Sequence, residues 1–209
     1  STLDRSSAAS DVYKRQRFFR QNYNAFRKSL NAPFVKGDRQ YPLGTIATRS
    51  TMLDIYEKLI TRDPVGALDE LSENAAIYAG IILNKTDGLT PAQRDSYQDL
   101  QRVQGAPSYL LLMYLIKNSD ALGIGVDDIV KVCKLLVNFF VRRNLTDTPP
   151  TRDLVRMFMS YIEEIEQNGY AGTVIYDNLR STLIKSSSSD EIFEEKLRGP
   201  VYDDNSGAT

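Results

Sequence analysis

Apolar residues recur at spacings of three and four along most of the chain, and polar residues fill the positions between them. This period is typical of amphipathic helices, because the side chains of a strand alternate between faces at every second residue. The pattern therefore predicts an all-α fold, an irregular multi-helix bundle. No internal repeat of fixed period is present, so residues 17–202 are predicted to form a single helical domain.

Start and stop signals delimit the predicted helices of the first half. A first helix ends before a loop over residues 31–43 that contains proline and glycine. A second helix starts near Thr48 or Ser50, and Asp63-Pro64 opens a third with an N-cap followed by proline. The residues predicted to face the core are Phe18, Phe19, Tyr23, Phe26 and Leu30 in the first helix, Leu53, Tyr56, Leu59 and Ile60 in the second, and Leu68, Leu71, Ala75, Tyr78, Ala79, Ile82 and Leu83 in the third.

The second half carries stronger signals. Thr90-Pro91 precedes a polar helix, and residues 109–116 are apolar on nearly every side, which predicts a helix in the centre of the bundle. Further helices are predicted from Asp127 or Asp128 to Asn144, from a Thr151 cap to a Gly169 stop, from Thr173 to Ile184 and from Asp190 to Leu197, with Ser186 to Ser189 as a loop. The first two of these are predicted to bury Ile129, Val132, Cys133, Leu136, Phe139 and Phe140, and Leu154, Val155, Phe158, Tyr161, Ile162 and Ile165.

Both ends of the chain differ from its body. Residues 6–16, Ser-Ser-Ala-Ala-Ser-Asp-Val-Tyr-Lys-Arg-Gln, resemble a codon-by-codon translation of a transposase sequencing adaptor, and residues 1–5 fit the flanking primer and index. We therefore expect residues 1–16 to be adaptor-derived and not native. Residues 203–209 are polar and show no helical or strand pattern, and we interpret them as a truncated tail.

Composition excludes several kinds of catalytic site. The chain contains no histidine, which excludes Ser-His-Asp and Cys-His triads and any zinc or HNH nuclease site built with histidine. Neither a phosphate-binding GxxxxGK[ST] loop nor a dinucleotide fingerprint occurs, so no cofactor site is predicted in this chain. The single cysteine, Cys133, lies in an apolar run, where a buried core thiol in a reducing compartment is expected.

The charge balance gives no sign of a domain that binds polyanions. Without residues 1–16 the chain has 23 basic and 25 acidic side chains, so only local basic patches are candidates for nucleic-acid contact. No apolar segment is long enough to cross a membrane and no signal peptide is evident, so no membrane partner is expected. A cytoplasmic location is the resulting expectation.

A family resemblance emerges in the segment from Asp127 to Ile165. There a helix ends in Val141-Arg142-Arg143, and a polar turn leads through Pro150-Thr151 into the next helix. This arrangement resembles the helical middle region of GmrSD-type, modification-dependent type IV restriction endonucleases, although Arg152 stands where that family carries asparagine. Further stretches similar to the family follow the same order, so the resemblance covers most of residues 17–202; they are residues 17–23, 48–56, 75–78, 108–116 and 193–202.

The resemblance implies a longer parent protein that cleaves foreign, modified DNA. It implies an N-terminal domain with an Asp-Gly-Gln-Gln-Arg box for nucleotide hydrolysis and a C-terminal domain with an HNH-type nuclease centre. A nucleoside triphosphate and a divalent metal are thus the cofactors implied for the parent, and the flanking domains and DNA are the implied partners. Neither flanking motif occurs in residues 17–209, which leaves this chain as the scaffold between them.

Arg142 and Arg143 are the candidate contact residues. Cations at the end of a helix complement the negative end of its dipole and bond its last carbonyls, which is a structural role. The functional alternative is contact with a DNA phosphate or with a flanking domain. A second basic cluster, from Arg17 to Arg39, interleaves with aromatic residues, a mixture that suits nucleic acid but also suits a core-facing helix with a solvated opposite face.

Two function classes remain open. In the first, the chain is a helical scaffold fragment of a DNA-cleaving defence endonuclease whose catalytic domains lie outside it. In the second, it is a non-enzymatic helical module that binds or regulates another protein, with its aromatic-rich first helix as the contact. Both classes predict no catalytic, cofactor-binding or metal-binding residue in the chain itself. The coding sequence on either side of residues 17–209 separates them.

Overall fold

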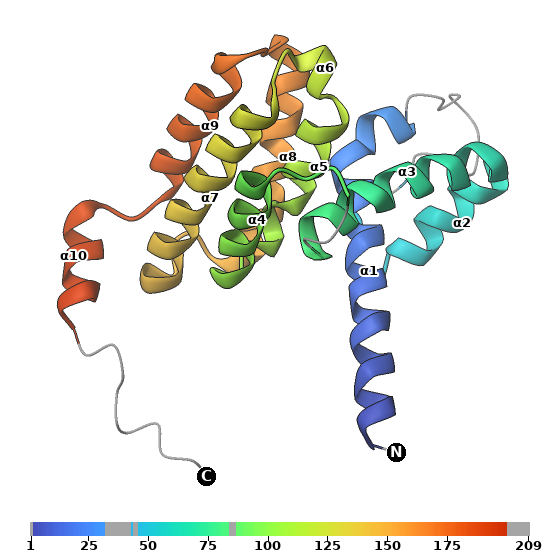
Figure 1. Ribbon diagram of the computed structural model, residues 1–209, viewed down its shortest axis with the longest axis horizontal. Helices are drawn as coiled ribbons and strands as arrows, with labels where there is room; N and C mark the ends of the chain where they lie inside the picture. The colour runs from blue at the N-terminus through green and yellow to red at the C-terminus, as the bar shows by residue number, and fades with distance from the viewer. Residues whose placement is uncertain (1, 32–42, 44–45, 84–86, 200–209) are drawn as a thin grey trace. The chain divides into compact units, whose positions relative to one another are not determined.

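A computed structural model of the chain describes residues 2–31, 43, 46–83 and 87–199, with side chains from Val12 onward. The described residues form ten α-helices and one short 3-10 helix with no strand among them, which confirms the predicted all-α class (Figure 1). They divide into two compact units: unit 1 is Ser1–Leu89 with Tyr109–Asn118, and unit 2 is Thr90–Ser108 with Ser119–Thr209. The hydrophobic pattern, which predicted one domain over residues 17–202, did not indicate this division.

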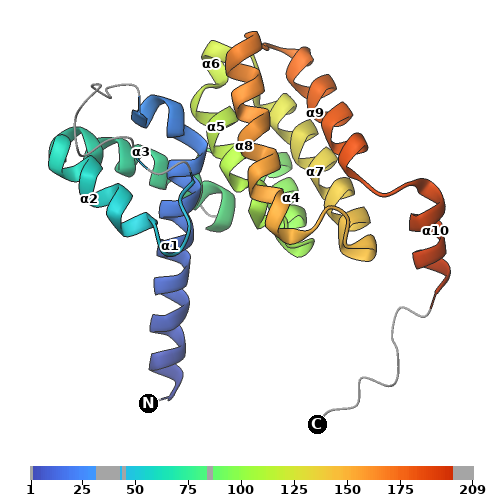
Figure 2. The same ribbon diagram turned by 180° about the vertical axis from the view of Figure 1, so that it is seen from behind.

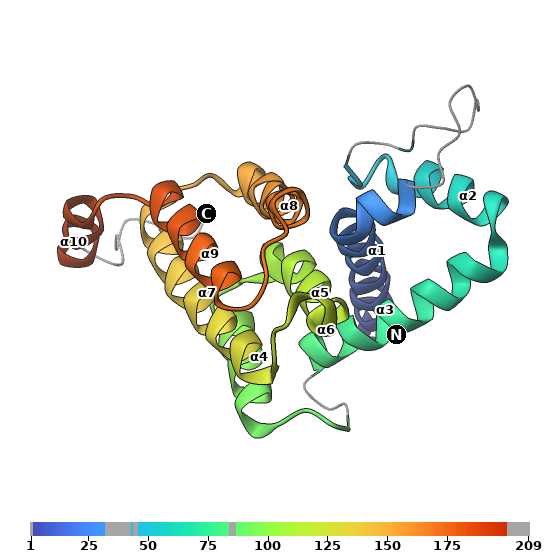
Figure 3. The same ribbon diagram turned by 90° about the horizontal axis from the view of Figure 1, so that it is seen from above.

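Unit 1 consists of the helices α1 (Thr2–Asn31), α2 (Met52–Arg62), α3 (Pro64–Leu83) and α5 (Tyr109–Lys117). Helix α5 packs against α1 and α3, and α2 packs against the same two helices. Figure 3 shows the sharp turn between α2 and α3. The turn forms at Asp63, whose Oδ1 accepts a hydrogen bond of 3.0 Å from the N–H of Gly66, so the predicted start of the third helix is confirmed.

Helix α5 is the most deeply buried element of unit 1. All of its residues from Tyr109 to Leu115 are buried, and several have no exposed surface; these are Leu110, Leu111, Leu112, Met113 and Leu115. A helix that is apolar on every side has no face to offer water, so burial on all sides is its only stable placement. The predicted burial of residues 109–116 is confirmed through Leu115, and Ile116 is half-buried.

Buried polar side chains connect α1 to the rest of unit 1. Asn22 donates from Nδ2 to the hydroxyl of Tyr56 at 2.9 Å, and this hydroxyl donates to the carbonyl of Phe19 at 2.8 Å. Asn74 of α3 donates to Oδ1 of Asn22 at 2.7 Å. Burial raises the pKa of Tyr56 well above its usual range, so the hydroxyl keeps the proton that it donates. The network fixes the register of three helices, because each broken bond leaves a buried polar group unpaired.

The predicted core faces of α2 and α3 are partly wrong. Helix α2 begins at Met52, after Thr48 and Thr51 have exchanged backbone-to-hydroxyl hydrogen bonds. Its buried residues are therefore Met52, Ile55, Tyr56 and Leu59, while the predicted Leu53 and Ile60 are exposed. In α3 the predicted Leu68 and Leu83 are exposed and Ile81 is buried instead. Both helices carry apolar residues outside the buried stripe, so spacing alone did not select the stripe. The predicted loop over residues 31–43 lies almost wholly outside the described residues.

Unit 2 consists of α4 (Pro91–Arg102), η1 (Ala106–Ser108), α6 (Ser119–Leu122), α7 (Val126–Thr146), α8 (Thr151–Asn168), α9 (Thr173–Ser186) and α10 (Asp190–Arg198). Helix α7 packs against α4, α9 and α10, and α8 packs against η1 and α9. Figures 1 and 2 show α7 and α9 running side by side, with α10 beyond them. The elements η1 and α6 were not predicted, because a single turn is too short to display a helical period.

The predicted core face of α7 is confirmed at every position, since Ile129, Val132, Cys133, Leu136, Phe139 and Phe140 are all buried. Phe139 meets Phe158 of α8 edge to face, with 6.4 Å between the ring centroids. The predicted face of α8 is also buried except at Val155, which is half-buried. Helix α8 ends at Gly169, whose φ of +64° favours glycine, as the stop signal predicted. The Tyr161 hydroxyl then joins α8 to α9 by donating to the carbonyl of Ile175.

The reactivity of the Cys133 thiol reports how tightly the core of unit 2 is packed. Cys133 is fully buried, and burial raises the pKa of its thiol to about 12, so very little nucleophilic thiolate exists at neutral pH. We expect a thiol reagent at pH 8 to label native protein about a thousandfold or more slowly than protein unfolded in urea, because labelling requires opening of the core. Because the chain has one cysteine, the reaction reports this site alone. Fast labelling of native protein contradicts the packing of α7.

Candidate functional site

Helix α7 ends where the sequence placed the candidate arginines. Asp147 adopts a left-handed backbone conformation, with φ of 52°, and its N–H donates to the carbonyl of Arg143 at 2.7 Å. Aspartate tolerates this conformation better than most residues, so it closes the last turn. Thr148, Pro149 and Pro150 then lead into α8. Both arginine side chains therefore project from the final turn of α7, and both turn back to the protein.

Arg143 holds the turn between α7 and α8. Its guanidinium donates to the Pro149 carbonyl at 3.1 Å, to Asp147 Oδ1 at 2.7 Å and to Thr151 Oγ1 at 2.6 Å. The side chain is 14 % exposed. The predicted role for Thr151 as an N-cap is wrong, because Thr151 is the first residue of α8 and its hydroxyl accepts from Arg143 instead. The planar fork of arginine makes these separate contacts at once, which a lysine ammonium does not reproduce.

Arg142 holds α10 against α7. Its Nη1 donates to the Ser188 carbonyl at 3.0 Å, and its Nη2 pairs with Asp190 Oδ1 at 2.5 Å. The guanidinium carbon also lies over the ring of Phe193, 4.6 Å from the centroid. A cation above an aromatic face is attracted by the negative charge of the ring face. One side chain thus contacts α10 and the loop before it in three ways.

Helix α10 depends heavily on that side chain. None of its residues is buried, and Ile192 and Leu197 expose about half of their surfaces, 47 % and 51 %. Its first turn is capped locally, since the Ser189 hydroxyl accepts from the N–H of Ile192 at 3.4 Å. Because Phe193 is only half-buried and the other apolar residues of α10 are exposed, contacts with Arg142 supply much of its attachment.

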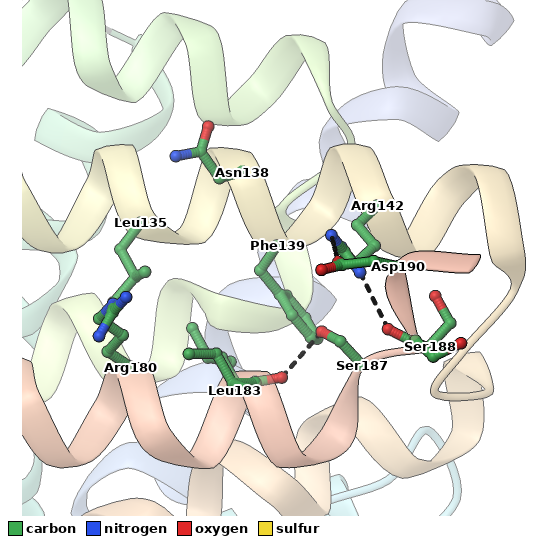
Figure 4. Close-up of a pocket in the computed structure, with 11 residues that line it drawn as sticks. Leu135, Asn138, Phe139, Arg142, Arg180, Leu183, Ser187, Ser188 and Asp190 are labelled. Carbon is green, nitrogen blue, oxygen red and sulfur yellow. Dashed lines mark hydrogen bonds and ion pairs between the residues drawn. The ribbon is translucent and has the colours of Figure 1, made fainter. Parts of the chain in front are cut away.

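A cavity of about 580 Å³ opens beside this attachment, between α7, α9 and the loop before α10 (Figure 4). Leu135, Phe139 and Leu183 form apolar walls, and Arg142 lies at the α10 end. Arg180 of α9 also lines the cavity. Sequence reasoning singled out Arg142 but missed Arg180 and Ser188. The only sequence signal for them is the run of four serines after a basic helix, which was interpreted as a loop.

The described basic and aromatic side chains at the start of the chain contact other residues of the protein, which is not the arrangement of a nucleic-acid groove. Arg17 donates to the hydroxyl of Tyr13 at 2.6 Å and lies over its ring, and Arg20 donates to the carbonyl of Gln16 at 3.4 Å. Both partners belong to the segment expected to be adaptor-derived. The aromatic residues of the cluster turn inward, since Phe19 meets the ring of Tyr56 with 4.9 Å between centroids. Lys36 and Arg39 lie outside the described residues.

The described residues contain no group of three or more His, Cys, Asp or Glu side chains arranged to hold a metal ion. None of the helices described is both long and apolar enough to cross a membrane. Comparisons with protein-family models, curated proteins and solved structures find no match for this chain. The candidate site therefore rests on the residues at the end of α7 and on the cavity beside them.

Replacing Arg142 with alanine is expected to release α10 while leaving the rest of unit 2 folded. The ion pair and the cation–π contact are each worth up to about 1 kcal/mol at an exposed site. Hydrogen exchange of the α10 amides should therefore accelerate about tenfold, and that of the α7 core should not change. Arg142→Lys keeps the charge but loses the fork, and it should give an intermediate rate. Unchanged α10 exchange in Arg142→Ala contradicts this account.

Replacing Arg143 with alanine is expected to lower the stability of unit 2 by about 1 to 3 kcal/mol, because several charge-assisted hydrogen bonds to one turn are lost together. The measurement is the urea midpoint. Arg152→Ala is the matched control, since the Arg152 side chain is 85 % exposed and contacts Asp153 only at 3.9 Å. Equal midpoints for the two variants rule out a holding role for Arg143.

Proposed function

We propose that residues 17–202 form the helical scaffold of a DNA-cleaving defence endonuclease, between an N-terminal nucleotide-using domain and a C-terminal HNH-type nuclease domain. The supporting observation is the contact between Arg142 and Phe193. Each lies in a stretch that resembles the GmrSD-type family, and the stretches are far apart in sequence. A scaffold that transmits a movement to a C-terminal domain needs a contact of this kind near its own C-terminal end.

The attachment of α10 by Arg142 forms an adjustable joint, at which α10 can move relative to α7. Helix α10 is the last described element, and Arg142 attaches it by an ion pair, a backbone hydrogen bond and a ring contact. Exposed polar contacts are weak one by one, so the joint is reversible. The half-exposed Ile192 and Leu197 give α10 apolar surface for a flanking domain to cover.

For Arg142 and Arg143, a scaffold role through contacts within the protein is better supported than contact with a DNA phosphate. The guanidinium groups of Arg142 and Arg143 already donate to Ser188, Asp190, Pro149, Asp147 and Thr151. A DNA phosphate would have to displace these partners, and Asp190 and Asp147 would repel it. We therefore propose that both arginines act within the protein and at the interdomain link, and that DNA contacts belong to the parent's other domains.

The alternative, a helical module that binds another protein, is favoured by a different observation. Leu53 on α2 and Val65 and Leu68 on α3 are 74 %, 68 % and 60 % exposed. Exposed apolar residues of this size mark protein interaction surfaces when they gather on one face. A scaffold within a larger protein also needs such surfaces, so the observation fits both functions and does not separate them.

The coding sequence on both sides of residues 17–209 tests the scaffold proposal first. We expect an Asp-Gly-Gln-Gln-Arg box upstream and a histidine-containing nuclease motif downstream in the same reading frame. Stop codons close to either side, with neither motif, overturn the proposal and leave the interaction module. This outcome is independent of how residues 17–202 fold.

The parent protein then provides a functional measurement. We expect Arg142→Ala to leave nucleotide hydrolysis intact and to reduce nucleotide-stimulated cleavage of modified DNA about tenfold, because loss of the joint uncouples the domains. Arg152→Ala is the control and should cleave normally. Equal loss of hydrolysis and cleavage in Arg142→Ala indicates misfolding rather than uncoupling and contradicts a linking role.

A further inference from the structure

The cavity between α7 and α9 is a groove lined by a row of residues from each helix. The rows run from Leu135 to Arg142 on α7 and from Arg180 to Ser187 on α9, each at positions i, i+3, i+4 and i+7. In Figure 4 both rows run from left to right, with the side chains of Phe139 and Leu183 between them. This spacing is the one at which a helix presents a face to a neighbouring helix. The groove therefore has the form of a seat for a third helix.

Helix α10 has an apolar face that its observed position leaves largely in water. Phe193 and Leu197 lie one turn apart and share a face, and Ile192 lies beside them. Phe193 is half-buried under Arg142, while Ile192 and Leu197 are 47 % and 51 % exposed. A helix of nine residues is too short to persist in water by itself, so it depends on packing. Burial of this face would stabilise α10 more than its present contacts do.

The loop before α10 is suited to act as a hinge. Ser187 follows α9 and Ser189 caps α10, and both have an extended backbone. Ser188 between them is 9 % exposed, and its hydroxyl oxygen is buried without a hydrogen-bond partner among the described residues. A buried hydroxyl without a partner costs free energy, and a turn of the loop that exposes it to water removes this cost. Loops of about two to five residues join antiparallel helices, so these three serines are enough to fold α10 back along α9.

The length of α10 matches the length of the groove. A helix rises about 1.5 Å per residue, so each row of the groove is about 10 Å long. Phe193 lies about 6 Å along α10 from Ser189, and Leu183 lies about 6 Å along α9 from Ser187. Folded back antiparallel to α9, α10 brings Phe193 level with Leu183. Leu197, one turn further on, then reaches the far end of the groove.

The charges on the two sides also match. When Phe193 and Leu197 of a right-handed helix face the groove in this direction, Glu194 turns toward α9, on which Arg180 lines the groove. Arg180 is exposed and has no ion-pair partner among the described residues. Glu194 pairs at 3.2 Å with Arg198, and both side chains of that pair are exposed, so the contact is weak and replaceable.

From these observations we propose that α10 is a lid with two positions, the observed open one and a closed one in which it folds back into the groove between α7 and α9. In the closed position Phe193 and Leu197 lie against the apolar walls and Glu194 meets Arg180. Closure withholds the apolar face of α10 from any other protein, and opening presents it. The proposal concerns this chain alone and does not depend on the scaffold function.

Disulfide trapping in the 209-residue chain tests closure. Arg180→Cys is combined with Glu194→Cys, oxidised glutathione is added, and the crosslink is identified by the mass of the joined peptides. Cys133 does not interfere, because burial raises the pKa of its thiol and keeps it protonated. The matched control is Arg180→Cys with Glu195→Cys, since residue 195 lies at the same level of α10 and faces away from the groove.

We expect the 180–194 disulfide to form within one chain at least about tenfold faster than the 180–195 disulfide. Equal rates indicate that α10 moves without a preferred seat and overturn the proposal. Absence of any disulfide within one chain overturns it as well. A disulfide that forms only between two chains indicates exchange of α10 between copies, which also contradicts a lid.

Variants of the apolar contact test what holds the lid closed. Ile184→Asp places a charge on the wall of the groove and should slow the 180–194 disulfide about tenfold. Val174→Asp, at an exposed position of α9 outside the groove, is the control and should not slow it. Leu197→Asp on α10 should act like Ile184→Asp, and Leu197→Met should keep the full rate. All of these side chains are about half exposed, so circular dichroism should show unchanged folding. Full rates in both Ile184→Asp and Leu197→Asp, or equal slowing by Val174→Asp, overturn the proposal.

Discussion

Burial of one face of α7 is the constraint on which unit 2 depends. Seven of its residues, from Ile129 to Phe140, are buried among α4, α8 and α9. A buried aliphatic or aromatic side chain contributes about 1.5 to 3 kcal/mol, whereas a surface ion pair contributes about 1 kcal/mol at most. The rotation of α7 about its axis is therefore set by the core. The arginines in its last turn lie where that rotation puts them.

The periodicity of the helix explains why the arginines diverge. Arg142 lies one turn beyond Phe139 and two turns beyond Leu135, so it emerges on the side of α9 and the cavity. Arg143 lies one turn beyond Phe140, and it reaches the turn that leads into α8. Adjacent residues thus hold different elements, one α10 and the other the start of α8. Guanidinium groups suit both tasks because each has several donors in a fixed plane.

Unit 1 is held by a different balance of forces. Its most deeply buried helix, α5, has apolar residues on every side, which by themselves do not specify one orientation. The bonds among Asn22, Tyr56 and Asn74 supply direction, because each joins particular positions on two of the helices α1, α2 and α3. Apolar burial and polar pairing together give unit 1 a defined packing.

The sequence by itself determined the all-α class, the buried face of α7, the burial of α5 and the helix starts at Asp63 and Thr90, because these depend on local spacing and capping. It misassigned Leu53 and Leu68, since both lie at helical spacing from other apolar residues, and only packing against neighbouring helices decides which of these are buried. Arg142 and Arg143 were identifiable as a pair, but their partners were not, as Asp190 and Phe193 are distant in sequence. The same holds for Arg180 and Ser188, which line one cavity with α7 only because tertiary packing brings α9 and the serine loop beside it.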